Sequence, residues 1–81
     1  MLEHLKEREK VIGLKQTIKA VHKNSCEVVY IASDVDTDII SHLLEMCKNN
    51  GVKIDRSQDM RQLGKACGID VGASAVGILS Q

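Results

Sequence analysis

The feature that most limits how this chain folds is a nearly continuous apolar run over residues 27–32. A strand with one face in water alternates apolar and polar residues, whereas a strand covered on both faces is apolar throughout. The run therefore predicts a central strand, with helices packed on both sides of its sheet. The chain has 81 residues, which suffice for one domain with a single modest core.

Two segments that flank this run have the apolar spacing of amphipathic helices. The first covers residues 14–23 and follows Gly13, a plausible N-cap. The second ends at residues 49–51, where Asn-Asn-Gly is a strong stop signal, and its buried stripe is predicted to contain Ile39, Ile40, Leu43, Leu44 and Cys47. A short additional helix is compatible with residues 2–9.

A third helix is predicted over residues 57–67. Its cap is Ser57 or Asp59, and Asp59 together with Gln62 resembles a capping box. Met60, Leu63 and Cys67 are expected on its inward face.

The remaining apolar segments predict strands. Val11 and Ile12 form a brief apolar step, residues 52–56 alternate as an edge strand does, and residues 73–79 supply a last strand. Helices and strands therefore alternate along the chain with short connections. This order predicts an α/β fold, a three-layer α/β/α sandwich around a small mixed sheet of four strands.

Residues that often carry chemistry do not form a recognisable site here. Cys26, Cys47 and Cys67 are widely spaced in apolar surroundings, so we expect core residues rather than disulfides or zinc ligands. The sequence contains no phosphate-binding glycine loop and no nucleophile elbow. We expect no enzymatic activity, no metal and no cofactor.

An acidic cluster imitates a calcium-binding loop in its spacing and consists of Asp34, Asp36, Asp38 and Glu45. The sixth position of such a loop must be glycine for its sharp turn, and here it is Ile39. We therefore interpret these acidic residues as the cap and first turn of a helix, where the helix dipole favours negative charge.

Charge is divided unevenly along the chain, although the formal net charge is zero. Residues 1–23 carry six Lys and Arg against three Glu, while residues 27–45 carry five acidic residues and no Lys or Arg. We expect an electrostatically two-sided molecule. No apolar run approaches the roughly 18 residues that cross a bilayer, and no signal-peptide core is present, so we expect a cytoplasmic protein without a membrane partner.

Two segments stand out as candidate binding surfaces. Lys15, Lys19 and Lys23 recur every four residues on one side of the first helix. Free N–H groups at the start of that helix, beside Lys15 and Gln16, suit phosphate or the acceptor edges of bases. In the second segment, residues 63–76, a glycine-rich turn is predicted to present Ile69 and Val71 outward. The alternative is a helix C-cap at Gly68 followed by a buried loop.

The segments Gly-Leu-Lys-Gln-Thr-Ile-Lys (13–19) and Leu-Gly-Lys-Ala-Cys-Gly-Ile-Asp-Val-Gly (63–72) together resemble the two signature segments of the ribosomal protein L7Ae/L30e family. The resemblance covers essentially the whole chain and is to the short bacterial members. It implies a single RNA-binding domain over residues 1–81 that recognises kink-turns, in which an RNA helix bends sharply at a bulge and tandem G·A pairs.

By the same resemblance, the helix after the first glycine enters the groove at the G·A pairs, and the second segment covers the unstacked bulge nucleotides. The RNA-binding residues it implies are Gly13, Leu14, Lys15, Gln16, Lys19, Ile69, Asp70 and Val71. Archaeal and eukaryotic members commonly have Asn-Glu where this chain has Lys15-Gln16, so a charged acceptor is replaced by a neutral amide and a cation.

The partners implied are structured RNA and the ribosome, and binding shifts RNA toward its kinked form. The near-minimal size of the chain favours a monomer. A competing interpretation from another class is a protein-interaction or ribosome-assembly module that uses the loop over residues 68–72.

Overall fold

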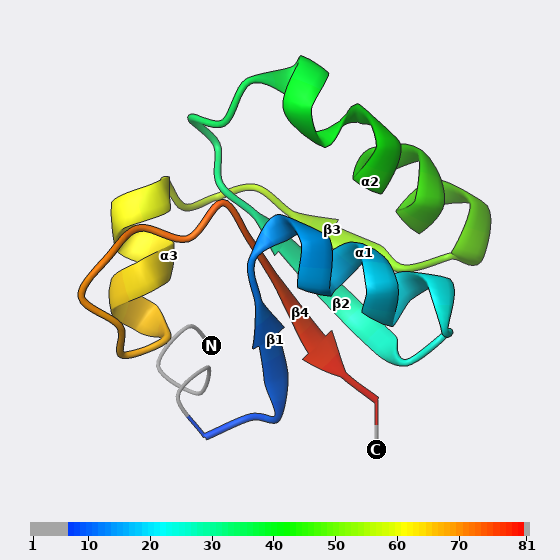
Figure 1. Cartoon of the computed structure of the whole chain (residues 1–81), viewed down its shortest axis with the longest axis horizontal. Helices are drawn as coiled ribbons and strands as arrows, with labels where there is room; N and C mark the ends of the chain where they lie inside the picture. Colours follow the sequence, from blue (N-terminus) through cyan, green and yellow to red (C-terminus); the bar gives the residue numbers. More distant parts are fainter. Residues whose placement is uncertain (1–6, 81) are drawn as a thin grey trace.

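The computed structural model describes residues 7–80 (Figure 1). Within this range the elements follow in the order β1 (Lys10–Ile12), α1 (Leu14–His22), β2 (Cys26–Ile31), α2 (Thr37–Asn50), β3 (Lys53–Asp55), α3 (Met60–Ala66) and β4 (Ala75–Leu79). The alternation predicted from the sequence is confirmed. The short helix expected over residues 2–9 falls mainly outside the described residues.

The strands of residues 7–80 form one mixed sheet in the order β1-β4-β2-β3. β4 is antiparallel to both β1 and β2, whereas β2 and β3 are parallel. Tyr30 of β2 lies opposite Val76 of β4 on one side and Asp55 of β3 on the other. β2 therefore has a paired strand on each side, and β3 is an edge strand, as the sequence predicts.

Helices cover both faces of this sheet, and Figure 1 shows α1 and α2 on one side with α3 on the other. Val29 and Ile31 of β2 pack in the cluster under α1 and α2, whereas Val28 and Tyr30 pack in the cluster that contains Leu63 of α3. Alternate residues of a strand point to opposite faces, so the consecutive apolar residues 28–31 of β2 pack into both clusters. The three-layer sandwich is confirmed.

Local capping signals fix where the helices begin and end. Asp36 caps α2 by accepting a hydrogen bond from the N–H of Asp38 (3.0 Å), and Gly51 ends it in the left-handed conformation at φ 67°. Asp59 and Gln62 form both hydrogen bonds of the predicted capping box at α3. The prediction for the acidic cluster is therefore correct for Asp36 and Asp38 but wrong for the other two residues: Glu45 lies in the interior of α2, and Asp34 accepts from the N–H of Met60 at the start of α3.

Two elements begin two or more residues later than predicted. α3 begins at Met60 rather than residue 57, because the N–H and hydroxyl of Ser57 both donate to Asp55 Oδ1 in a tight turn (2.9 and 2.6 Å). β4 begins at Ala75 rather than residue 73, because the N–H of Ala73 donates to the carbonyl of Met60 (3.0 Å), which belongs to a helix and not to the sheet.

The predicted apolar stripe of α2 was wrong at one position. Ile40, Leu43 and Cys47 are fully buried, but the side chain of Ile39 is 60% exposed. Successive helical residues are about 100° apart around the axis, so Ile39 in the first turn lies beside the stripe that begins at Ile40.

The three cysteines are free and buried, as expected of core residues. Burial raises the pKa of the Cys47 thiol to about 11, with Cys26 adding to the effect. Burial also raises the pKa of Cys26 and of Cys67. A thiol with a raised pKa is a poor nucleophile, because the thiolate is the reactive form. No helix within residues 7–80 is long and apolar enough to span a membrane.

Candidate nucleic-acid interface

The start of α1 is held against β4 by the backbone of Gly13. Its N–H donates to the carbonyl of Ala75 (2.8 Å), and its carbonyl accepts from the N–H and hydroxyl of Thr17 (3.0 and 2.7 Å). Gly13 has φ 112°, a conformation that a residue with a side chain rarely adopts. Thr17 is fully buried, so these hydrogen bonds are shielded from water and fix the first turn to the sheet.

The exposed side of this first turn is cationic and rich in donors. Lys15, Gln16 and Lys19 are exposed, whereas Leu14 is half-buried and packs on the core beneath α1. Gly13 provides no side-chain cap, and the first turn contains no acidic residue. The leading N–H groups of α1, which lack partners within the helix, therefore stand beside two lysines, an arrangement that attracts anions.

Gln16 and Lys19 also line a hollow of about 240 Å³ on the β1 side of the helix. Its other lining residues are Val11, Ala20, Lys23, Ser25 and Leu79. The two polar side chains that α1 contributes, Gln16 and Lys19, are exposed, as is Lys23 directly after the helix.

The second predicted segment forms the α3–β4 loop, residues 67–74. Just after α3, Gly68 has φ 80° and its N–H donates to the carbonyl of Lys65 (3.0 Å), while the N–H of Ile69 donates to the carbonyl of Gly64 (3.1 Å). These two hydrogen bonds define a Schellman motif, which commonly brings an apolar residue back onto the helix. Ile69 fulfils that role here, because it is half-buried against the cluster under α3.

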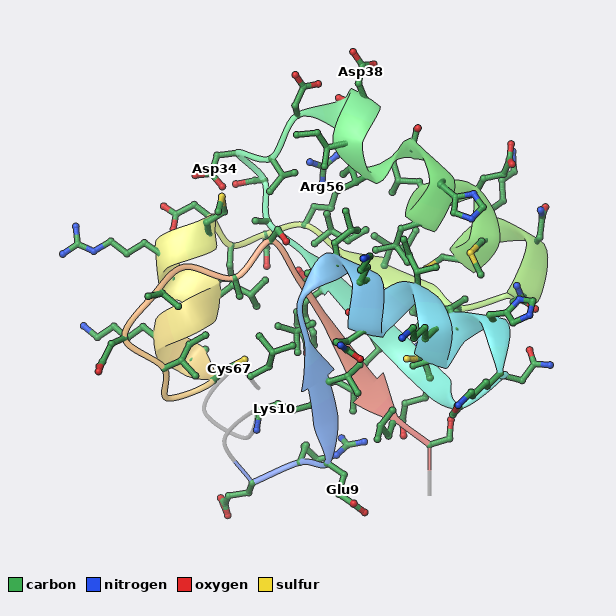
Figure 2. All side chains as sticks on the ribbon, viewed as in Figure 1. Glu9, Lys10, Asp34, Asp38, Arg56 and Cys67 are labelled. Carbon is green, nitrogen blue, oxygen red and sulfur yellow. The ribbon has the colours of Figure 1, made fainter. Side chains whose placement is uncertain are left out.

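The loop returns along the length of α3. Figure 2 shows Cys67 at the opposite end of α3 from Asp34, and Asp34 accepts from the N–H of Met60 at the start of the helix (2.9 Å). A Cβ at Gly64 would overlap the carbonyl oxygen of Val71, and one at Gly72 would lie 3.3 Å from Met60 Cβ. Glycine at both positions thus allows the loop backbone to lie directly on the helix.

This contact decides which loop residues face solvent. Because the carbonyl of Val71 faces Gly64, its side chain lies on the outer side and is 70% exposed. Asp70 is also exposed. The prediction that Ile69 and Val71 both point outward is therefore correct for Val71 and wrong for Ile69, which the C-cap at Gly68 turns toward the core. The alternative of a capped helix with a buried loop describes Ile69 but not Val71.

The two segments meet at one edge of the sheet. The N–H of Gly13 is bonded to Ala75, the residue that follows the α3–β4 loop, and the carbonyl of Ser74 accepts from the N–H of Ala32 at the end of β2 (2.9 Å). Figure 1 shows the start of α1 and the end of this loop at the same end of β4. Residues far apart in the sequence are thereby fixed in one surface region.

Comparison with known proteins agrees with this arrangement. The model of the Ribosomal protein L7Ae/L30e/S12e/Gadd45 family matches residues 2–81. The chain belongs to this family. The resemblance of residues 13–19 and 63–72 to its signature segments is confirmed at the level of the family.

Relatives within this family include short bacterial proteins named as RNA-binding. A protein of Caldanaerobacter subterraneus named RNA-binding protein is 42% identical over 66 residues, covering 82% of this chain and 80% of its own length. An RNA-binding protein of Bacillus pumilus is 41% identical over 69 residues, covering 85% and 84%. The large ribosomal subunit protein eL8 of Halobacterium salinarum is 29% identical, covering 84% and 58%.

Solved structures share the fold. The 15.5kD RNA binding protein of Giardia lamblia matches with a TM-score of 0.86 at 26% identity, covering 99% of this chain and 68% of that one. A protein with unknown function from Bacillus halodurans matches with a TM-score of 0.88 at 23% identity, covering 98% and 83%.

One part of this surface in the L7Ae-type fold was missed by the sequence analysis. Arg61 and Lys65 are exposed on α3 and line a hollow of about 270 Å³ with residues 69–72 of the loop. Their spacing of four residues puts them on one side of the predicted helix, but no local pattern indicates that the loop returns past that side.

Proposed function

We propose that this protein binds structured RNA at kink-turns and stabilises the kinked form. The observation that carries the proposal is the hydrogen bond from Gly13 to Ala75 of β4, which holds the donor-rich start of α1 beside the end of the loop that exposes Val71. A kink-turn offers matching features, namely guanine edges and phosphates at its G·A pairs and unstacked bases at its bulge. Membership of the L7Ae/L30e/S12e/Gadd45 family and the names of its bacterial relatives support the same function.

In this proposal the start of α1 contacts the G·A pairs. Gln16 accepts and donates hydrogen bonds at guanine edges, because its amide carries both kinds of group. Lys15 and Lys19 bind nearby phosphates, a strong but less selective attraction. Gly13 and Leu14 set the start of the helix, Gly13 through its backbone conformation and Leu14 through its packing on the core.

The α3–β4 loop covers the bulge. The exposed side chain of Val71 packs against an unstacked base, where it loses its contact with water. Asp70 stands next to it at the surface, and Ile69 holds the loop in place from its half-buried position. Recognition then combines a charged, salt-dependent contact with an apolar contact that salt affects little.

The proposed activity is binding without chemistry. A protein that contacts only the kinked RNA shifts the equilibrium toward it by its differential affinity. The buried, protonated thiols fit a role confined to packing. Residues 1–81 act as one RNA-binding domain, as a monomer, on cytoplasmic RNA that includes ribosomal RNA.

The test is a titration of labelled kink-turn RNA and of a matched duplex in which Watson–Crick pairs replace the G·A pairs, at two salt concentrations. We expect tight binding to the first RNA alone, together with increased folding into the kinked form. Equal and strongly salt-dependent binding to both RNAs would reduce the function to a general basic surface. Absence of binding to either would contradict the proposal and favour a protein partner at residues 68–72, whose binding survives nuclease treatment.

A further inference from the structure

A second cationic site lies on α3, away from the start of α1. Arg61 and Lys65 are one helical turn apart, both are exposed, and both line the hollow of about 270 Å³. The opposite wall of the hollow is the α3–β4 loop, which contributes Ile69, Asp70, Val71 and Gly72. The hollow is therefore shared between a helix and the loop proposed to cover the RNA bulge.

These two cations are available to a ligand. Neither makes a hydrogen bond or ion pair with any residue in the range 7–80. Arg8, in contrast, pairs with Glu27 (2.9 Å), and Arg56 donates to the carbonyls of Ala32 and Val35 (3.1 and 3.5 Å). Arg8 and Arg56 thus have structural partners, whereas Arg61 and Lys65 hold their charge at the surface without one.

The walls of the hollow are fixed relative to each other. The carbonyl of Val71 lies against Gly64, which belongs to the same helix as the two cations, and the N–H of Ala73 is bonded to Met60. The distance between the cations and the exposed side chain of Val71 is thereby set by backbone contacts. A nucleotide seated on Val71 would have its neighbouring phosphate at a defined place.

We propose that Arg61 and Lys65 bind a backbone phosphate of the RNA strand that crosses Val71. This inference rests on the proposed RNA-binding function and extends its footprint from α1 to α3. The guanidinium of arginine offers several fixed donors that match phosphate oxygens, and the lysine ammonium adds a point charge. Asp70 in the same hollow offsets part of this charge, so the pair acts on a phosphate already held in place by the rest of the RNA rather than on a free anion.

The experiment compares two double variants in titrations with the kink-turn RNA over a range of salt concentrations. Arg61→Gln/Lys65→Gln removes the proposed pair. The control Lys48→Gln/Lys53→Gln removes the same charge from exposed lysines of α2 and β3, which also make no ion pair within residues 7–80. Thermal unfolding shows whether each variant is folded, and the single variant Arg61→Gln replaces the first if it is not.

We expect the Arg61→Gln/Lys65→Gln variant to lose about tenfold in affinity, and the slope of log K against log salt to fall by about 0.8, since one phosphate contact contributes about 0.7 to 0.9. The preference for G·A over Watson–Crick pairs stays unchanged, because phosphates carry no sequence information. The Lys48→Gln/Lys53→Gln variant should bind with nearly the wild-type affinity and slope.

Equal losses in both variants, or no loss in either, would overturn the inference. Inorganic phosphate added at constant ionic strength should not displace the RNA, and displacement would identify a site for the free anion instead. If wild-type protein binds both RNAs equally but still depends on Arg61 and Lys65, the kink-turn proposal fails and the phosphate site stands. If wild-type protein binds neither RNA, both fail.

Discussion

The start of α1 and the α3–β4 loop occupy one surface region but are built in different ways. α1 is anchored by hydrogen bonds of Gly13 and by the buried Thr17, and it exposes lysines and free N–H groups. The loop is anchored by contact of its backbone with Gly64, and it exposes the apolar side chain of Val71. One segment offers charge and hydrogen bonding, and the other offers shape and apolar area.

This difference shows how a protein with no net charge can bind nucleic acid. A bulk positive field is not required when cations are concentrated at a few places on the surface, such as the start of α1, and are joined there by an apolar contact. The two contributions should separate in experiment, because salt weakens contacts with phosphate and leaves apolar contacts nearly unchanged.

The largest effect is expected from Gly64→Ala. The added methyl group overlaps the carbonyl of Val71, so the loop must leave the helix, and we expect the free energy of unfolding to fall by about 2 kcal/mol. RNA affinity should fall as well. Gly51→Ala is the control. Gly51 ends α2 at φ 67°, where alanine is strained, so this variant should be less stable but, once folded, should bind RNA with the wild-type affinity. If the folded Gly64→Ala protein binds RNA with the wild-type affinity, the loop is not part of the site.

Val71→Ser tests the proposed apolar contact between the α3–β4 loop and RNA. The side chain is 70% exposed, so stability should change little, while affinity for kink-turn RNA should fall about tenfold through lost apolar burial. The salt slope should remain that of the wild type. Ile39→Ser, at a similarly exposed residue of α2, should leave binding unchanged. A reduced salt slope in Val71→Ser would contradict the division between the two segments.

Lys19→Gln tests the charged half. We expect affinity to fall about fivefold for every RNA that binds, and the salt slope to decrease by about 1. Unfolding monitored by circular dichroism should match the wild type, since Lys19 is exposed. Lys48→Gln, which removes the same charge from α2, is the control. An unchanged salt slope would show that Lys19 does not contact a phosphate.

The smallest effect is expected from Gln16→Ala, which separates specificity from affinity within α1. The preference for G·A over Watson–Crick pairs should fall about threefold, while the salt slope stays constant, because a neutral hydrogen-bonding group is removed. Competition between the two RNAs measures this ratio directly. If the ratio does not change, Gln16 does not contact the guanine edges.

Local signals predicted much of the fold from the sequence. The capping box of Asp59 with Gln62 and the helix stop at Gly51 depend on residues close together in the chain, and both are present. The apolar run over residues 27–32 predicted layers on both faces of the sheet, because apolar side chains at consecutive strand positions point to opposite faces and both sets must be covered.

The surface region was less predictable, because long-range contacts decide it. The exposure of Val71 and the half-burial of Ile69 follow from how the loop returns onto Gly64 and from the cap at Gly68. Likewise the hollow beside Arg61 and Lys65 exists only because the loop passes α3. Periodicity places residues on a side of a helix but does not say what packs beside that side.

The position of β4 in the sheet has a consequence for how the protein is made. β4 follows the other described strands in the chain, yet it lies between β1 and β2 and accepts the hydrogen bond of Gly13 through Ala75. During synthesis, the hydrogen bond that holds the start of α1 beside the end of the loop cannot form until residue 75 has emerged from the ribosome and inserted into the sheet. A nascent or truncated chain that ends before this strand therefore lacks the assembled surface, and RNA binding is coupled to completion of the sheet.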